Sequence, residues 1–169
     1  VAVIGPSGSG KTTLLYLAAG IVSPLSGAVR VAGHDISRQT DAERRGFRIR
    51  QIGLVFQEFE LLEYLTVREN ILLPYRINPA LPLDRAVRQR VGAVAEAVGL
   101  SHALDRYPHR LSQGERQRVA LSRALITQPR LILADEPTGN LDPQTSRTIV
   151  SLLLDQARQT GATVLMVTH

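Results

Sequence analysis

Short apolar runs alternate along the chain with segments whose apolar residues recur every three or four positions. The runs predict β-strands and the periodic segments predict α-helices, because side chains repeat every two residues in a strand and about every 3.6 in a helix. Strands are predicted over residues 1–4, 28–31, 52–56, 131–134 and 163–167. Helices are predicted over residues 11–19, 111–125 and 142–160. This alternation is typical of an α/β fold with a largely parallel sheet flanked by helices.

The pattern changes between residues 57 and 112, where helices are expected over 66–73 and 83–98. Proline has no backbone N–H and is expected to break the chain between these helices. The prolines in question are Pro74, Pro79 and Pro82. We therefore expect a small helical subdomain of approximately residues 60–111 within a single domain that covers residues 1–169.

Both ends of the chain carry runs that predict buried strands. The run at residues 1–4 has nothing before it, and only two residues follow the run at 164–167. A natural domain seldom begins and ends inside its central sheet, because bare strand edges invite aggregation. We therefore expect the chain to be an internal part of a longer domain, truncated at both ends.

Composition narrows the possible functions without naming one. The 169 residues are 44% hydrophobic and carry a net charge of +5, with arginines spread along the chain. We interpret this charge as solvated helix faces and expect no nucleic-acid partner. The absence of cysteine excludes disulfides and cysteine zinc sites. No apolar run approaches the roughly 20 residues that span a bilayer, so attachment to a membrane would require a partner or further chain.

One segment matches the phosphate-binding pattern G-x-x-x-x-G-K-[ST], between a predicted strand and a predicted helix. Glycines in this loop let backbone N–H groups turn toward phosphates, and the helix adds the positive end of its dipole. Lys11 would reach the β- and γ-phosphates, and the Thr12 hydroxyl would ligate Mg²⁺. The predicted ATP-binding residues are Gly5, Pro6, Ser7, Gly8, Ser9, Gly10, Lys11, Thr12 and Thr13.

Two carboxylates follow the apolar run at residues 131–134. Ligands of open α/β sheets lie beyond the carboxyl ends of the strands, so Asp135 is expected near the phosphate loop, where it can hold Mg²⁺. The adjacent Glu136 can orient or deprotonate an attacking water. A polar pair that merely closes a buried strand is the alternative, and the phosphate loop argues against it.

The segment Leu111-Ser112-Gln113-Gly114-Glu115 begins a predicted helix, and Ser112 and Glu115 have the spacing of a capping box. Together with its companion motifs it makes the whole chain resemble the ABC ATPase family. Those companions, in order, are the phosphate loop, Gln57 after a strand, Asp135-Glu136, Gly139-Asn140-Leu141-Asp142, and His169 after a strand. The sequence of residues 136–142 is similar to that of the subgroup that drives lipoprotein release, macrolide export and related systems.

The resemblance implies a P-loop NTPase fold and a head-to-tail dimer with two ATP molecules between two such domains, most simply a homodimer. Ser112, Gln113 and Gly114 would then contact the γ-phosphate held by the opposite subunit. Asp142 would stabilise the dimer seam, and His169 would contact the γ-phosphate and support hydrolysis. Gln57 would meet Mg²⁺ and the attacking water.

The resemblance also implies a membrane partner. This partner would be a permease, as a separate subunit or a fused domain, with the ATPase peripheral at the cytoplasmic face of the inner membrane. Residues 61–73 would pass the motion to the permease, and ATP hydrolysis would power export or extraction of a substrate.

The chain departs from the family's usual signature, LSGGQ, at two positions. Gln113 stands where the middle glycine is expected, and Glu115 replaces the usual glutamine, a change that the subgroup often shows. Two other functions remain open on the sequence. A soluble ABC ATPase acting on nucleic acid or ribosomes is one, although no long coiled-coil pattern separates the motifs. A nucleotide-binding regulatory module without turnover is the other, and the presence of Glu136 and His169 argues against it.

Overall fold

A four-stranded parallel sheet forms the centre of the computed structural model, which describes residues 1–79 and 81–168. Its strand order is β1-β6-β5-β4, and a separate antiparallel hairpin joins β2 to β3. The central strands are β1 (Ala2–Ile4), β6 (Thr163–Thr168), β5 (Leu131–Asp135) and β4 (Ile52–Val55). The hairpin strands are β2 (Arg30–Val31) and β3 (His34–Asp35). The sheet and its helices confirm the predicted α/β class.

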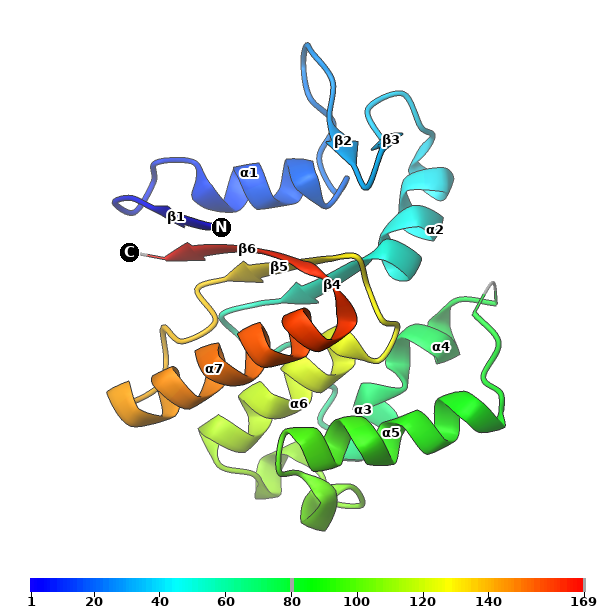
Figure 1. Cartoon of the computed structure of the whole chain (residues 1–169), viewed down its shortest axis with the longest axis vertical. Helices are drawn as coiled ribbons and strands as arrows, with labels where there is room; N and C mark the ends of the chain where they lie inside the picture. Colours follow the sequence, from blue (N-terminus) through cyan, green and yellow to red (C-terminus); the bar gives the residue numbers. More distant parts are fainter. Residues whose placement is uncertain (80, 169) are drawn as a thin grey trace.

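Helices cover both faces of this sheet (Figure 1). They are α1 (Lys11–Ala18), α2 (Asp41–Gln51), α3 (Val67–Ile71), α4 (Leu73–Ile77), α5 (Arg85–Ala97), α6 (Gln113–Leu125) and α7 (Pro143–Thr160). Two short 3-10 turns, η1 (Ser101–Ala103) and η2 (Pro108–Arg110), lead from α5 to α6. In the described ranges, no helix combines the length and the apolar character needed to cross a bilayer.

Alternation along β5 separates two hydrophobic cores. Leu133 packs with Leu15 of α1 in one core, whereas Ile132 and Ala134 pack with α6 in the other. Successive side chains of a strand point to opposite faces of a sheet, so this is the pattern that a strand covered on both sides requires. The helices α1 and α6 therefore lie on opposite faces of the sheet.

The strand β1 is present where it was predicted, and it pairs with β6. In the part of the chain that the structure describes, Ile4 is 72% exposed, so the predicted burial of this strand is not seen there.

The predicted break at Pro74 is also wrong. Pro74 lies in the first turn of α4, which begins directly after the end of α3. Proline is tolerated there because an N–H in the first turn has no partner within the helix. The single helix predicted over residues 66–73 is therefore two short helices.

The helix α2 was not predicted, and it carries the arginines of the charged run at residues 44–50. Thr40 and Glu43 form a capping box at its start, with the Thr40 N–H donating to Glu43 Oε2 at 2.7 Å. Arg48 donates to the carbonyls of Ala19 and Gly20 and so fastens α2 to the end of α1. The Arg48 guanidinium therefore connects two helices as well as contributing charge.

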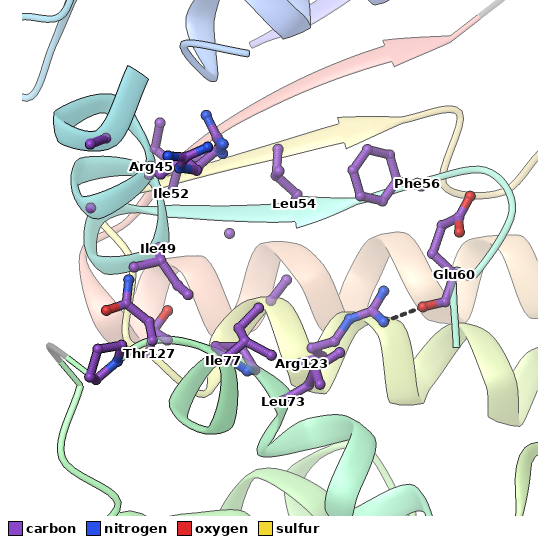
Figure 2. Close-up of a pocket in the computed structure, with 18 residues that line it drawn as sticks. Arg45, Ile49, Ile52, Leu54, Phe56, Glu60, Leu73, Ile77, Arg123 and Thr127 are labelled. Carbon is purple, nitrogen blue, oxygen red and sulfur yellow. Dashed lines mark hydrogen bonds between the residues drawn. The ribbon is translucent and has the colours of Figure 1, made fainter. Parts of the chain in front are cut away.

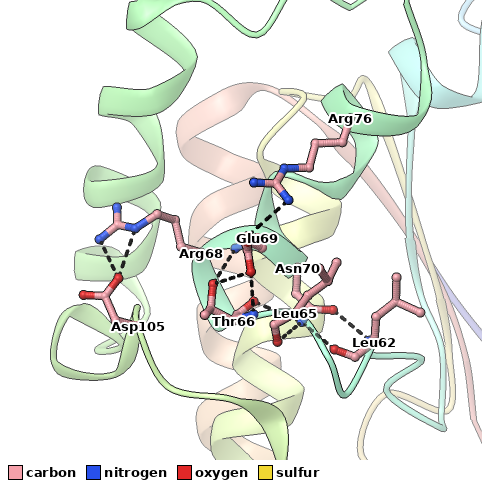
Figure 3. A network of polar contacts seen from close by, with 8 residues as sticks. All are labelled: Leu62, Leu65, Thr66, Arg68, Glu69, Asn70, Arg76 and Asp105. Atoms are coloured by element: carbon pink, nitrogen blue, oxygen red, sulfur yellow. Dashed lines mark hydrogen bonds and ion pairs between the residues drawn. The ribbon is translucent and has the colours of Figure 1, made fainter.

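A buried amide organises the loop that precedes α3 (Figure 3). Asn70 is fully buried, and its Nδ2 donates to the carbonyls of Leu62, Leu65 and Thr66 at 3.0–3.1 Å. Its Oδ1 accepts from the Leu62 N–H at 2.9 Å. A buried polar group costs little only when its hydrogen bonds are made, and here one side chain holds three turns of loop backbone in place. At the N-terminus of α3, Thr66 and Glu69 add a capping box.

The strand β4 approaches α6 closely at Gly53. A Cβ added there would lie 2.5 Å from the Ala124 carbonyl oxygen of α6 and 3.1 Å from Pro129 Cγ. We expect Gly53→Ala to lower the free energy of unfolding by about 1–3 kcal/mol, because α6 must move away from the sheet. Urea unfolding would measure this change.

Gly92 in α5 provides the matched control, since nothing lies within 4 Å of an added Cβ there. Gly92→Ala should raise the free energy of unfolding by about 0.5–1 kcal/mol through helix propensity alone. Equal effects at the two glycines would show that the packing of α6 on β4 is not tight.

Candidate functional site

The carboxyl ends of the four parallel strands meet at one edge of the sheet (Figure 1). The register pairs Ile4 with Thr168 and Asp135 with Val167. The phosphate loop, the acidic pair and the segment after β4 consequently leave the sheet at the same edge. This is the edge at which open parallel sheets bind ligands.

The phosphate loop joins β1 to α1 through two glycines in the left-handed region. Gly8 has a φ of 79° and Gly10 a φ of 88°, conformations that residues with a Cβ rarely adopt. Gly10 is the N-cap of α1, where no side-chain cap is formed and the first turn has no acidic residue. The positive end of the helix dipole therefore faces the loop without a competing side chain.

Lys11 holds the loop closed in this structure. Its Nζ donates to the carbonyl oxygens of Gly5 at 2.7 Å and Pro6 at 2.9 Å, and the residue is only 8% exposed. An ammonium group so placed presents positive charge at the centre of a concave backbone. Such a cradle is suited to the phosphates of a nucleotide.

Thr12 and Asp135 provide the oxygen ligands that Mg²⁺ prefers. The Thr12 hydroxyl donates to Asp135 Oδ1 at 3.3 Å, across 123 positions of sequence. Asp135 continues the alternation of β5, so it faces α1 on the same side of the sheet as Leu133. A hydroxyl and a carboxylate at hydrogen-bond distance fit a hard cation that keeps several waters. Across the described ranges, no group of three or more His, Cys, Asp or Glu side chains forms a metal-binding cluster.

Glu136 has a strained backbone. Its φ is 44°, in the left-handed region, and its N–H donates to the Val167 carbonyl of β6 at 3.0 Å. Its own carbonyl accepts from the Gly139 N–H at 3.0 Å. Non-glycine residues in this conformation cost on the order of 1–3 kcal/mol and concentrate at functional sites. The strain turns the chain sharply directly after the strand.

Gln57 lies against the loop that follows this turn. A Cβ added at Gly139 would be 3.1 Å from Gln57 Nε2, and the Asn140 Nδ2 donates to the Gln57 carbonyl at 3.4 Å. The loops after β4 and β5 are therefore in contact. The sequence had given only the order of the two motifs along the chain. Gln57 itself is exposed and accessible to a ligand at the edge of the sheet.

Ser112 caps α6 in the predicted capping box. Glu115 Oε2 accepts from the Ser112 N–H and from the Ser112 hydroxyl, both at 2.8 Å, and the Glu115 N–H donates to Ser112 Oγ at 3.3 Å. The other carboxylate oxygen lies 3.0 Å from His102 Nε2. The bond from the Ser112 N–H is the largest cause that lowers the pKa of Glu115 from 4.5 to about 2, with smaller contributions from the Ser112 hydroxyl and His102. Glutamate at this position thus ties the signature segment to η1.

Gly114 of α6 lies close to α7. An added Cβ would be 2.9 Å from Thr145 Cγ2 of α7. Gln113, by contrast, is exposed, so its side chain does not prevent this approach. Asp142 caps α7 and accepts from the Gln144 and Thr145 N–H groups, both at 3.0 Å. The pKa of Asp142 is lowered, mainly by its hydrogen bond with the side chain of Thr145 and then by the backbone N–H groups.

The predicted site residues divide into two groups on opposite sides of the sheet. Residues 5–13, Gln57, Asp135 and Glu136 gather at its carboxyl edge, whereas Ser112, Gln113 and Gly114 begin α6, which packs on the face away from α1. His169, predicted to support hydrolysis, lies outside the described residues.

Two residues of α6 that join it to the carboxyl edge were not identified from the sequence. Gln117 donates from Nε2 to the Pro137 carbonyl at 2.6 Å, directly after Glu136. Arg123 donates to the carbonyls of Phe59 and Glu60 in the loop after Gln57 (Figure 2). Both lie in a polar segment that reads as an ordinary solvated helix face, so the sequence offers no signal for either.

The known proteins that this chain resembles are ATP-binding proteins of ABC transporters. The family profile described as "ABC transporter" matches residues 1–139. The lipoprotein-releasing system ATP-binding protein LolD 1 of Rhodopirellula baltica is 45% identical over 168 residues, which are 99% of this chain and 72% of that protein. The methionine import ATP-binding protein MetN 2 of Paraburkholderia xenovorans is 46% identical over 169 residues, covering 99% of this chain and 42% of that protein.

A solved structure has the same fold. It is the dimeric ATP-binding cassette MJ0796 in a post-hydrolysis state bound to ADP and Pi. It superposes with a TM-score of 0.87 at 35% identity, over 99% of this chain and 73% of that chain.

The low pKa of Glu115 makes the capping box of α6 sensitive to acid. A carboxylate whose pKa is lowered on folding stabilises the fold fully above its unfolded pKa, 4.5, and that contribution is lost as the pH falls toward about 2. Relative to Glu115→Gln, the wild type should therefore be most favoured near pH 7 and lose this advantage progressively below about pH 4.5. Urea unfolding at pH 7, 5, 4 and 3 would measure the difference, and a constant difference over that range would contradict this origin of the cap's strength.

Proposed function

Because the chain belongs to the ABC transporter family, as an ATP-binding domain of its ATPases, we propose that it powers transport through a membrane permease by ATP-driven dimerisation. The observation that carries this proposal is the placement of α1 and α6 on opposite faces of one sheet. Each face then offers one half of a nucleotide site, and a second copy of the domain supplies the other half.

The first half binds ATP and Mg²⁺. Residues 5–13 surround the triphosphate, with Lys11 moving from the loop carbonyls to the β- and γ-phosphates. Thr12 and Asp135 would hold Mg²⁺, with Gln57 as a further ligand. The metal, when bound, neutralises charge on the phosphates. The exposed position of Gln57 and the 3.3 Å separation between Thr12 Oγ1 and Asp135 Oδ1 support these roles.

The second half is the N-terminus of α6 in the opposite subunit. There Ser112, Gln113 and Gly114 contact the γ-phosphate through the positive end of the helix dipole. In the present structure the Ser112 hydroxyl is engaged by Glu115, so it must exchange that bond for one to the phosphate. The dimeric form of the MJ0796 cassette supports this arrangement. In it, Asp142 at the start of α7 would lie at the seam between subunits.

Hydrolysis releases the two subunits from each other. Glu136 orients and deprotonates the attacking water, and the strained turn at its backbone holds its side chain at the edge of the sheet. His169, the residue that follows Thr168 in the sequence, would assist at the γ-phosphate. Loss of the bridging phosphate reopens the dimer.

The permease would contact a cavity bounded by α2, β4 and α4 (Figure 2). This cavity of about 880 Å³ is lined by Ile49 of α2, Leu54 of β4, and Leu73 and Ile77 of α4. Arg123 crosses its wall to the loop after Gln57. An apolar segment of a permease held here would sense the movement of that loop. In this arrangement the domain would work at the cytoplasmic face of the inner membrane.

We propose export, or extraction from the membrane, as the direction of transport. The wording of residues 136–142 and the lipoprotein-releasing relative support this direction. Import is the second candidate, supported by the methionine-import relative at 46% identity. Assays of the full-length protein with its permease in oriented vesicles would distinguish the two by the side on which substrate accumulates.

Glu136→Gln should separate ATP binding from hydrolysis. The variant keeps the phosphate loop and the signature segment but loses the base, so ATP should hold it as a dimer while turnover falls by at least about a hundredfold. Size-exclusion chromatography with light scattering, with ATP·Mg²⁺ and with ADP, would measure the dimer. Wild-type turnover in this variant would exclude Glu136 as the base.

Lys11→Ala should lose both ATP binding and ATP hydrolysis. Without the ammonium group the phosphates keep only backbone donors, and nucleotide binding should weaken by at least about tenfold because a charge-assisted bond is lost. Titration with a fluorescent ATP analogue would measure the change, and Lys11→Arg, which keeps the charge but not the shape, provides the comparison. Unchanged affinity in Lys11→Ala would contradict the assignment of the phosphate loop.

A further inference from the structure

The side chain of Gln117 is fully buried at the centre of α6, one and a half turns after Ser112. Its Nε2 donates to the Pro137 carbonyl at 2.6 Å, a contact across 20 positions of sequence. The orientation of the amide follows from this bond, because a carbonyl accepts and only the NH₂ group can donate. Gln117 therefore joins the helix that begins at the signature segment to the residue that follows Glu136.

The amide of Gln117 makes only part of the hydrogen bonds that it could make. Its Oε1 is buried and has no hydrogen-bond partner in the part of the chain that the structure describes. An apolar side chain of similar shape would avoid this unsatisfied acceptor but would leave the buried Pro137 carbonyl without the Gln117 donor. The bond to Pro137 is therefore what glutamine supplies at this position.

The bond acts on the loop that follows β5, which other hydrogen bonds also hold. The peptide on either side of Glu136 is fixed by the Val167 carbonyl and by the Gly139 N–H. Pro137 has a restricted φ and no N–H of its own, so its carbonyl is the group through which a neighbouring helix can orient it. A shift of α6 along its axis would be transmitted through Gln117 to the strained turn at Glu136.

We propose that Gln117 is a positioning residue that makes the Glu136 turn follow the position of α6. This inference rests on the proposed function, in which Ser112 contacts the ATP of the opposite subunit and Glu136 acts on the ATP of its own. Engagement of the opposite nucleotide by α6 would then bring Glu136 into position at the other site. The two sites of a dimer are thereby coupled through a single amide within each subunit.

Gln117→Met in the full-length protein tests this coupling, because it keeps the length of the side chain and removes the amide, and with it the donor to the Pro137 carbonyl. We expect kcat for ATP to fall by about three- to thirtyfold, the range of coupling effects of this kind, while KM and the midpoint of thermal unfolding change little. The Hill coefficient for ATP should fall toward 1, which a purely structural defect would not produce. Turnover and cooperativity equal to wild type would overturn the proposal.

Ser122→Ala is the matched control on the same helix. Ser122 is also fully buried, but its hydroxyl donates to the Arg118 carbonyl within α6 and reaches no loop. Its kcat and Hill coefficient should equal those of the wild type. A loss in Ser122→Ala as large as in Gln117→Met would assign the effect to packing of α6 and overturn the proposal.

Gln117→Glu provides a second test that does not depend on the stability of the first variant. The introduced carboxyl can donate to the Pro137 carbonyl only when protonated, and burial favours that form. Its turnover relative to wild type at the same pH should rise as the pH is lowered from 8 to 6, by up to about tenfold per unit. A ratio independent of pH, or one that falls, would overturn the proposal.

These outcomes are distinct from failure of the proposed function. If Glu136→Gln hydrolyses ATP normally, the ATPase assignment fails whatever Gln117 does. If Glu136→Gln is inactive while Gln117→Met retains wild-type kcat and cooperativity, only the role of Gln117 is lost.

Discussion

The parallel register of four strands is the constraint on which the rest of the site depends. Because β1, β6, β5 and β4 run in one direction, the segments that follow them leave the sheet at one edge. The phosphate loop, Asp135, Glu136 and Gln57 are distant in sequence and become neighbours for this reason alone. Alternation along β5 then turns Asp135 toward Thr12 and turns Ile132 and Ala134 toward α6, so one strand serves both faces.

The helix α6 relates the two faces to each other. Its N-terminus carries Ser112, its middle donates through Gln117 to Pro137, and its last turns donate through Arg123 to the loop after Gln57. A rigid helix with three such attachments moves all of them together when any one is displaced. Nucleotide in the opposite subunit, hydrolysis at Glu136 and a permease at the cavity beside Arg123 would all act on this one element.

The sequence predicted the parts of the molecule whose chemistry is local. Three such features depend only on residues close together in the sequence, and each is present. They are strand β5, the cap of α7 at Asp142 and the capping box at Ser112. Helix α2 escaped prediction because Phe47 is its only buried residue, although Thr40 and Glu43 mark its start. The contact of Gln117 with Pro137 depends on how a helix packs on a loop, and the strain at Glu136 exists only in the folded chain.

The central claim is that two surfaces on opposite faces of one domain meet at a single triphosphate between two subunits. Cysteine cross-linking tests it most directly, since residues 1–169 contain no cysteine of their own. Full-length Glu136→Gln protein carrying Ser9→Cys in the phosphate loop would be mixed with the same protein carrying Gln113→Cys, with other cysteines replaced. Rapid covalent dimer formation with ATP·Mg²⁺, only in the mixture and not with ADP, is the predicted result. Cross-linking that ignores nucleotide, or that forms only between two copies of Gln113→Cys, would contradict it.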